Sequence, residues 1–179
     1  MRKRAFTLIE LLMVIGIIGI LIGILLPVTA RARREAKKVA CKAQLANIAA
    51  AFQMYLNEND GWYPPATYWP EFSTGLPPVN EFLQKYISGV NKVFHCPADE
   101  KYFDKYNLSY SYYQELGERR MQQTFFYKIL RSSSKTPILW DADNYHGGSV
   151  PYNWLFADGH VDQFLQHGTP TTMPSPFSD

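Results

Sequence analysis

The first thirty residues of the chain have the sequence MRKRAFTLIELLMVIGIIGILIGILLPVTA (residues 1–30). Between Phe6 and Leu26 the only charged residue is Glu10, and apart from Thr7 and three glycines the other side chains are large and apolar. A helix rises about 1.5 Å per residue, so this stretch is roughly 30 Å long and matches the hydrocarbon core of a bilayer. It predicts a membrane-spanning helix, and the basic segment at residues 2–4 predicts a cytoplasmic N-terminus.

Two simpler interpretations of this stretch explain less. A cleaved secretory signal peptide has a shorter apolar run, followed by a small-x-small cleavage pattern that this chain does not show cleanly. A plain membrane anchor has no use for Glu10, because a charge within a membrane segment costs a few kcal/mol and is usually functional. A cut between Ala5 and Phe6 would create an α-amino group one helical turn from Glu10, or near the Glu10 of a neighbouring copy.

The short basic leader followed by FTLIELL (residues 6–12) resembles the N-terminal signal of type IV prepilins. In that family a membrane peptidase removes the leader, N-methylates the new first residue and leaves the apolar helix as the packing core of a filament. The resemblance therefore implies cleavage between Ala5 and Phe6, N-methylation of Phe6 and a role for Glu10 in assembly. Most members have Gly before the cut, where this chain has Ala5.

A second, amphipathic half of the same helix follows Pro27 and a charged collar at residues 31–38. Within a helix, Pro27 removes one hydrogen bond and predicts a kink or local melting, as it does at this place in the pilin family. The helix is expected to end near residues 59–61, where Gly61 supplies a left-handed cap. Spacing close to i, i+3, i+4, i+7 predicts one buried face, made of Val39, Leu45, Ile48, Ala49, Phe52 and Leu56.

The length of 179 residues leaves room for one domain beyond this helix, and an aromatic content of 15% suits a β-rich domain. Strands are expected at residues 108–113 and 138–140, and a hairpin at residues 153–164 with a type I′ turn at Asp158-Gly159. The predicted fold class is α+β, with a long N-terminal helix packed on a small antiparallel sheet, which is the pilin fold. The predicted parts are a cleaved leader (1–5), a transmembrane and filament-core helix (6–28), its amphipathic half (29–60), an exported globular domain (61–167) and a flexible tail (168–179).

The two cysteines, Cys41 and Cys96, both fall on the exported side of the predicted membrane helix. An oxidising compartment allows them to pair, and we predict a disulfide that closes a loop of roughly 55 residues and contributes about 4 kcal/mol. The pattern of a Cys on the helix and a Cys in a Cys-Pro-Ala-Asp turn also resembles that of prepilin-like proteins. Two buried free thiols, or a bond between two subunits, are the alternatives.

Residues 141–162, DADNYHGGSVPYNWLFADGHVD, form the segment richest in polar groups. They resemble a C-terminal motif of prepilin-like proteins in which nine residues separate a His from an Asp-Gly hairpin, whereas eleven separate His146 from Asp158 here. An acid/base pair or metal site among Asp141, Asp143, His146, Asp158 and His160 is the enzymatic alternative. No known metal-ligand spacing, nucleophile elbow or phosphate loop is present, so we expect no catalytic activity.

The sequence leaves open the binding of calcium. Some secretion pseudopilins bind Ca²⁺ in a C-terminal loop through aspartate and backbone oxygens, and this resemblance points to Asp141, Asp143 and Asn144. These side chains offer the hard oxygen ligands that Ca²⁺ prefers. A solvated loop with side-chain caps is the alternative, and otherwise we expect no cofactor.

Nucleic acid is not favoured as a partner. Loss of the three basic leader residues changes the formal charge from +2 to −1, so the exported part has no basic excess. The segment KYFDKYNLSYSYY (residues 101–113) interleaves aromatic residues with two lysines, which is a pattern for stacking single strands. Packing of a sheet face explains the same aromatic residues better.

Together these features predict a structural subunit of a type IV pilus-like filament or a type II secretion pseudopilus. The expected partners are other copies and related pilins, a prepilin peptidase, an inner-membrane assembly platform and the inner membrane itself. The expected location is the inner membrane with a single span, and the C-terminal domain in the periplasm or in an extracellular filament. The alternative is a minor pilin that binds a surface, a secreted substrate or DNA at a filament tip, and copy number per filament distinguishes the two roles.

Overall fold

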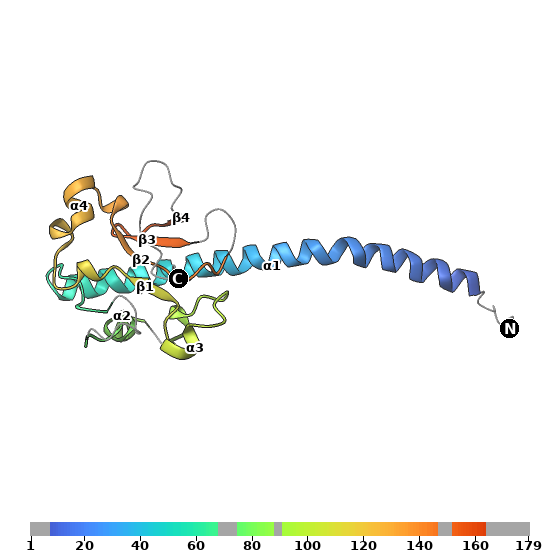
Figure 1. Cartoon of the computed structure of the whole chain (residues 1–179), viewed down its shortest axis with the longest axis horizontal. Helices are drawn as coiled ribbons and strands as arrows, with labels where there is room; N and C mark the ends of the chain where they lie inside the picture. Colours follow the sequence, from blue (N-terminus) through green and yellow to red (C-terminus); the bar gives the residue numbers. More distant parts are fainter. Residues whose placement is uncertain (1–7, 68–74, 88–90, 147–151, 164–179) are drawn as a thin grey trace, which may run out of the picture.

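The computed structural model describes residues 8–67, 75–87, 91–146 and 152–163. One very long helix carries a small antiparallel sheet domain at its C-terminal end, as Figure 1 shows, and this confirms the predicted α+β layout. The predicted cut between Ala5 and Phe6 and the predicted tail at residues 168–179 lie outside the described residues.

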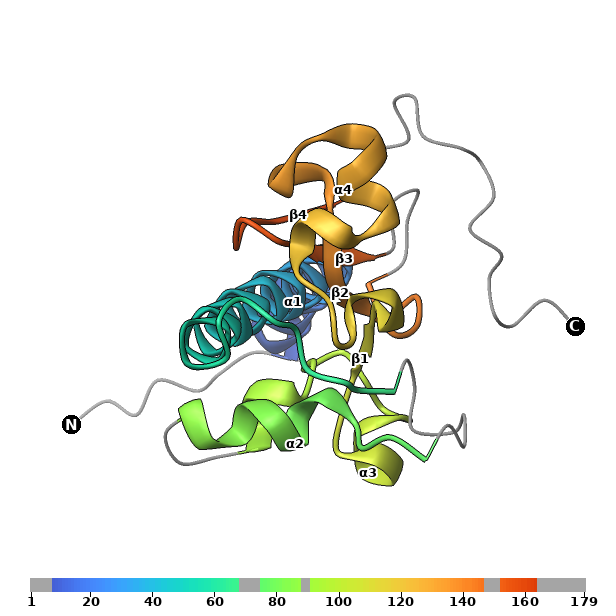
Figure 2. The ribbon, with the colours of Figure 1, turned by 90° about the vertical axis from the view of Figure 1, so that its left-hand side faces the viewer.

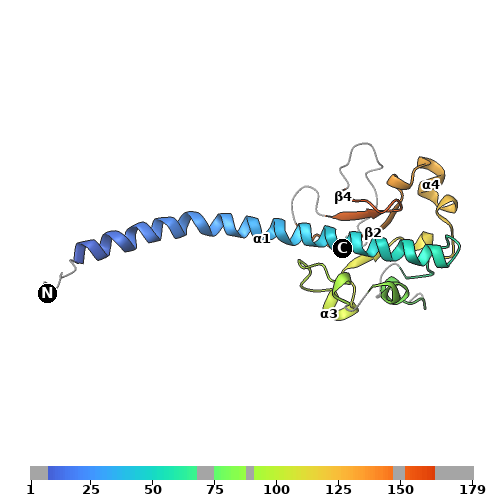
Figure 3. The ribbon, with the colours of Figure 1, turned by 180° about the vertical axis from the view of Figure 1, so that it is seen from behind.

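Helix α1 (Leu8–Glu58) contains 51 residues, which corresponds to roughly 75 Å at 1.5 Å per residue. Its N-terminal half projects away from the domain as a single rod (Figures 1 and 3). The helix continues unbroken through Pro27, so the predicted local melting is wrong, because a proline removes only one N–H from the ladder and leaves its neighbours intact. A kink at Pro27 stays a prediction.

The C-terminal end of α1 confirms the predicted left-handed cap. Asp60 has a φ of 51° and Gly61 a φ of 77°, so two successive residues adopt the left-handed conformation. The Gly61 N–H donates to the Leu56 carbonyl at 2.8 Å and satisfies one of the last carbonyls of the helix. The chain therefore leaves the helix at residue 58, close to where the sequence predicts.

The buried face of α1 differs from the prediction at one end. Leu45, Ile48 and Phe52 are fully buried, but Val39 is 65% exposed and Cys41 is buried in its place. A helix turns about 100° per residue, so position 41 lies close to the direction of Leu45, whereas position 39 lies about 120° away from it. The stripe therefore runs through positions 41, 45, 48 and 52, and it includes a cysteine that we predicted as a disulfide partner.

The sheet has four antiparallel strands in the order β1-β2-β3-β4. They are β1 (Tyr110–Tyr112), β2 (Pro137–Asp141), β3 (Asn153–Phe156) and β4 (Val161–Gln163). Each lies within or beside a segment that the sequence predicts as a strand, and β2 is buried along its whole length. Tyr110 pairs with Asp141, which places the end of β2 beside the start of β1.

The predicted type I′ turn of the β3–β4 hairpin is wrong. Gly159 has a φ of 90°, but Asp158 is not among the residues with positive φ. The Gly159 N–H donates to the Phe156 carbonyl at 2.9 Å, and the Phe156 N–H donates to the His160 carbonyl at 3.0 Å. This is the three-residue hairpin loop in which a left-handed glycine follows the turn. Asp158-Gly159 therefore marks the hairpin correctly, but its loop has three residues instead of the two of a type I′ turn.

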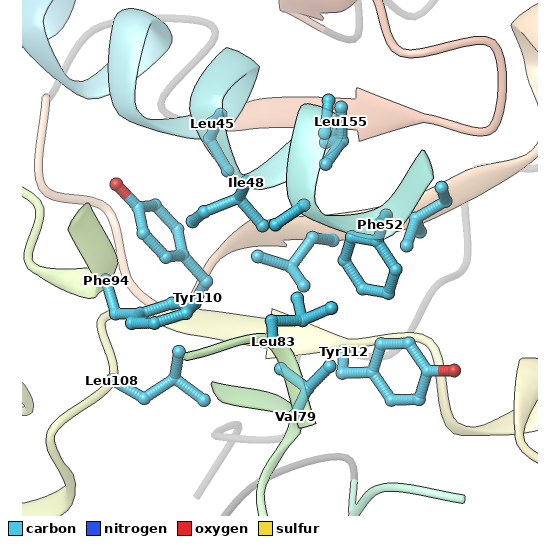
Figure 4. Close-up of a cluster of buried hydrophobic side chains, with 14 of the residues drawn as sticks. Leu45, Ile48, Phe52, Val79, Leu83, Phe94, Leu108, Tyr110, Tyr112 and Leu155 are labelled. Atoms are coloured by element: carbon cyan, nitrogen blue, oxygen red, sulfur yellow. The ribbon is translucent and has the colours of Figure 1, made fainter. Parts of the chain in front are cut away.

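The core lies between the packed part of α1 and the sheet, and short helices close its edges. Figure 4 shows Ile48 and Phe52 of α1 facing Tyr110 and Tyr112 of β1, and the Phe52 and Tyr112 rings are stacked with centroids 6.1 Å apart. Figure 2 shows α2 and α3 beyond the β1 edge of the sheet, with α4 toward the opposite edge. The remaining elements are α2 (Val79–Leu83), η1 (Gln84–Tyr86), η2 (Asn91–Phe94), α3 (Phe103–Tyr106), η3 (Gln114–Leu116), η4 (Met121–Gln123), α4 (Phe125–Leu130) and η5 (Ser133–Lys135).

Candidate functional site

The first candidate site is the projecting half of α1, which we define as residues 8–30. Every residue of this half is exposed, including a run of large apolar side chains such as Leu8, which is 85% exposed, and Ile20, which is 67% exposed. The helix is long and apolar enough to cross a membrane. A continuous apolar surface of this size marks contact with lipid or with another protein.

Glu10 lies near the start of this projecting half and is exposed among apolar neighbours. It is the acidic residue in the first turn of α1. The structure therefore places its carboxylate on the part of the helix that the domain does not cover. Its predicted role in assembly depends on what surrounds this half in the cell.

The second candidate site is a cluster of four metal-ligand types at the junction of α1 and the sheet. The side chains of Cys41, Cys96, Asp141 and His146 each bring one ligand atom into a group whose members all lie within 4.8 Å of one another. Cys41 belongs to α1, Cys96 follows η2, Asp141 ends β2 and His146 follows β2. We call these four residues the cysteine–histidine cluster.

Local structure fixes both cysteines. Cys41 is held by the helix on the buried stripe of α1, and its exposure is 0%. Cys96 begins a turn in which its carbonyl accepts the Asp99 N–H at 2.8 Å. The buried Asp99 carboxylate accepts the backbone N–H groups of Lys101, Tyr102 and Phe103, so it organises the loop that carries Cys96.

Asp141 is fully buried, and its two oxygens have different partners. Oδ2 accepts the backbone N–H of Asn153 at 2.8 Å and its side-chain amide at 2.9 Å. Oδ1 lies 3.1 Å from the Cys41 sulfur. The neighbouring strand β3 thus orients the carboxylate so that one oxygen faces the thiols.

His146 closes the cluster from the loop after β2. Its side chain is 2% exposed, and its Nε2 lies 3.5 Å from Asp141 Oδ2. The same nitrogen lies 3.5 Å from the Cys96 sulfur. Among the described residues no hydrogen-bond partner reaches its Nδ1. The imidazole therefore directs Nε2 at the thiols and the carboxylate.

Burial and hydrogen bonding together set the electrostatics of the cluster. Burial raises the pKa of Asp141 to about 7. The hydrogen bond between the two thiols, together with burial, raises the pKa of Cys41 far above its ordinary value. The same hydrogen bond lowers the pKa of Cys96, and His146 and a backbone hydrogen bond with Ala98 act in the same direction. Burial thus disfavours the charged forms of Asp141 and Cys41, whereas the thiol contact and His146 favour the thiolate of Cys96.

The predicted disulfide is not formed in the structure. Cys41 and Cys96 are both free and buried, although the cluster brings their sulfur atoms within 4.8 Å of each other. Each sulfur faces a polar group, Asp141 in one case and His146 in the other. The two cysteines selected from the sequence thus do meet, but Asp141 and His146, which the sequence also offered as metal or acid/base candidates, were not expected beside them.

The predicted calcium ligands divide between two environments. Asp141 lies in the cysteine–histidine cluster, which does not include Asp143. Asp143 instead accepts the backbone N–H of Asn144 at 2.7 Å, as a turn residue does. Calcium binding by these three residues stays a prediction.

The residues of the enzymatic alternative also lie in separate places. The side chains of Asp158 and His160 are hydrogen-bonded in the β3–β4 turn and are 35% and 41% exposed. They are not part of the cysteine–histidine cluster, which takes only Asp141 and His146 from that set. The structure therefore does not assemble the five polar residues into one acid/base site.

A comparison with protein families identifies the N-terminal signal. Residues 1–26 match the family model of the prokaryotic N-terminal methylation motif. The chain carries a prepilin-type N-terminus. This motif belongs to structural pilins and pseudopilins, and the C-terminal segment with His146 and Asp158 lies outside the match. No curated protein and no solved structure matches the chain.

Proposed function

We propose that this prepilin-type chain is a structural subunit of a type IV pilus-like or type II secretion pseudopilus filament. The supporting observation is the projecting half of α1, which carries the methylation motif and is exposed along its entire length. An apolar helix of this length needs lipid before assembly and other helices after it. The C-terminal end of α1 already has its partner in the sheet domain, so the two ends have separate tasks.

Other proteins would carry out the processing, the methylation and the extraction from the membrane. A prepilin peptidase cuts between Ala5 and Phe6 and methylates Phe6, and an assembly platform extracts the subunit from the inner membrane. Glu10 then pairs with the new N-terminal amine of a neighbouring subunit and sets the register. Pairing offsets the cost of placing a carboxylate in an apolar environment. The sheet domain faces outward, on the exported side.

The proposal is tested by the mass of the mature chain. The full-length chain is produced in membranes with and without a prepilin peptidase, and its intact mass and N-terminal sequence are determined. The expected product with the peptidase begins at Phe6 and carries an N-methyl group. A chain that still begins at Met1 and nevertheless forms filaments contradicts the proposal.

Two variants of one residue serve as matched controls. Ala5→Gly introduces the residue that most prepilins have at this position and is expected to be cut at least as well as the wild-type chain. Ala5→Leu places a bulky side chain at the cut and is expected to leave the leader attached. Equal processing of both variants would show that the cut does not occur at this site.

A further inference from the structure

The cysteine–histidine cluster is the feature that filament assembly does not explain. We propose that Cys41, Cys96, Asp141 and His146 form a structural Zn²⁺ site that fastens α1 to the sheet domain. All four residues belong to the folded domain, so this site and the proposed filament can be tested independently of each other.

The distances within the cluster fit a tetrahedrally coordinated ion. Zn²⁺ bonds of about 2.0–2.3 Å in a tetrahedron place neighbouring ligand atoms roughly 3.3–3.8 Å apart. The cluster has a Cys41 Sγ to Asp141 Oδ1 distance of 3.1 Å and a Cys96 Sγ to His146 Nε2 distance of 3.5 Å. All four ligand atoms lie within 4.8 Å of one another. Small side-chain shifts therefore suffice to bring the four atoms around one ion.

The chemistry of the four donor atoms also fits Zn²⁺. Two thiols, one imidazole and one carboxylate are ligands that Zn²⁺ takes in tetrahedral sites. Ca²⁺ instead takes six to eight oxygen ligands, which two sulfurs and a nitrogen do not supply. Because the protein provides all four ligands and buries them, no position is left open for a substrate. The site is therefore structural rather than catalytic.

Neighbouring side chains orient the proposed ligands. The two hydrogen bonds from Asn153 occupy Asp141 Oδ2 and leave Oδ1 directed at the Cys41 sulfur. The Tyr110 hydroxyl lies 3.5 Å from the Cys41 sulfur. Metal ligands in proteins are commonly oriented by such outer hydrogen bonds. These contacts would not be expected if the two thiols were neighbours only by chance.

A disulfide explains less of the cluster than a metal ion does. A disulfide would involve only the two sulfurs, and it would not explain why a buried carboxylate and a buried imidazole lie beside them. When Zn²⁺ binds, the two thiol protons leave to solvent, two Zn–S bonds form, and the charge of the ion compensates the buried anions. No oxidant is consumed, in contrast to disulfide formation.

A route from solvent reaches the His146 side of the cluster. A hollow of about 260 Å³ is lined by Arg34, Lys37, Ala98, Glu100, Tyr145 and His146. Lys37 and Glu100 form an exposed ion pair there, with a nitrogen–oxygen distance of 3.9 Å. An ion entering by this hollow meets His146 first and the cysteines behind it.

The test measures metal in the full-length chain, purified in detergent under reducing conditions. We expect about one Zn²⁺ per chain, as in other closed structural sites. After chelation, Co²⁺ added to the wild-type chain is expected to give the visible spectrum of a tetrahedral site and a thiolate-to-cobalt charge-transfer band. Added Zn²⁺ should abolish both signals. This measurement needs no substitution, so a variant that fails to fold does not block it.

Matched variants then assign the ligands. Cys96→Ser should lose the charge-transfer band at least in part, and His146→Ala should weaken Zn²⁺ binding by at least the roughly tenfold that loss of an outer-shell partner already costs. His160→Ala removes an exposed histidine outside the cluster and should keep the metal. Chelated wild-type chain that binds neither Zn²⁺ nor Co²⁺ overturns the proposal. A Cys41–Cys96 disulfide in protein taken from its native compartment, or binding of Ca²⁺ alone with loss in Asp143→Ala, overturns it as well.

Discussion

The two ends of α1 have the same backbone structure but opposite relations to the rest of the molecule. Residues 8–30 are exposed throughout, whereas residues 41, 45, 48 and 52 of the packed half (residues 38–58) are fully buried against the domain. One helix therefore presents an apolar surface all round at one end and a single apolar stripe at the other. A helix that is apolar all round must be buried by something, and the described part of its own chain does not bury it.

The difference indicates that the packed half stabilises the domain and that the projecting half is available for contacts outside its own domain. A change in the packed half acts on the domain, because its side chains touch the sheet and α2. A change in the projecting half acts on what the helix contacts outside its own chain. Four experiments test this separation, beginning with the largest expected effect.

Glu10→Ala is expected to abolish filament formation while the chain still inserts and folds. The charge lies in the projecting half, so its loss removes the proposed pairing with a neighbouring subunit and leaves the domain untouched. Filaments are counted by electron microscopy, and folding is followed by circular dichroism. Glu35→Ala, an exposed acidic residue of the same helix, is the control and should assemble normally. Filaments of normal length from Glu10→Ala would refute the assignment.

Ile48→Ala and Ile22→Ala compare the same truncation in the two halves. Ile48 is fully buried and Ile22 is 51% exposed. Truncation of a buried Ile leaves a cavity and lowers the free energy of unfolding by about 2–5 kcal/mol, whereas Ile22→Ala should leave the domain's value unchanged. Denaturant unfolding of the full-length chain in detergent, followed by near-UV circular dichroism, measures both. Similar losses for the two variants would show that the halves are not independent.

Removal of Zn²⁺ should destabilise the domain and leave the projecting half helical. At a free Zn²⁺ concentration 100 times the dissociation constant, the metal contributes about 2.7 kcal/mol to the free energy of unfolding, and chelation removes this amount. The same unfolding experiment, with and without chelator, measures it. The His146→Ala variant is expected to show no response to the chelator, and an equal response in that variant would contradict the site.

Asp158→Asn is expected to have the smallest effect, confined to the exposed β3–β4 turn. Partial burial raises the pKa of Asp158, but the hydrogen bonds from the side chain and backbone N–H of His160 outweigh it and lower the pKa below its ordinary value. A carboxylate with a lowered pKa stabilises the fold above its ordinary pKa of about 3.9, and this contribution disappears as the pH falls through the folded-state value.

The wild-type chain should therefore exceed Asp158→Asn in free energy of unfolding at pH 7, by less than about 1 kcal/mol, as is usual for exposed polar contacts of a carboxylate. The difference should vanish in acid. Asp104→Asn, which changes an exposed Asp on α3, is the control and should show less dependence on pH. A difference in free energy of unfolding that grows as the pH falls would contradict the prediction.

The amino-acid sequence by itself determined the projecting half, because everything that specifies it is local. The basic leader, the FTLIELL segment and the uninterrupted apolar run lie within the first 26 residues, which the family comparison matches. The α+β class and the four strands were also predictable, since alternation and turn residues act over short distances. Val39 and the Asp158-Gly159 turn were predicted wrongly, because the exact helical phase and the loop length depend on what packs against each segment.

Only the tertiary structure decided the cysteine–histidine cluster. Its members come from four places in the chain, residues 41, 96, 141 and 146, and their spacing matches no known ligand pattern. From the sequence, Cys41 and Cys96 were predicted to form a disulfide and Asp141 to bind calcium, and His146 was paired with Asp141 only in an enzymatic alternative that contained neither cysteine. The helix phase of α1, the Asp99-centred loop and the pairing of β2 with β1 and β3 bring these side chains together. Such a convergence depends on distances through space, which are set when the core closes and are not contained in any local pattern.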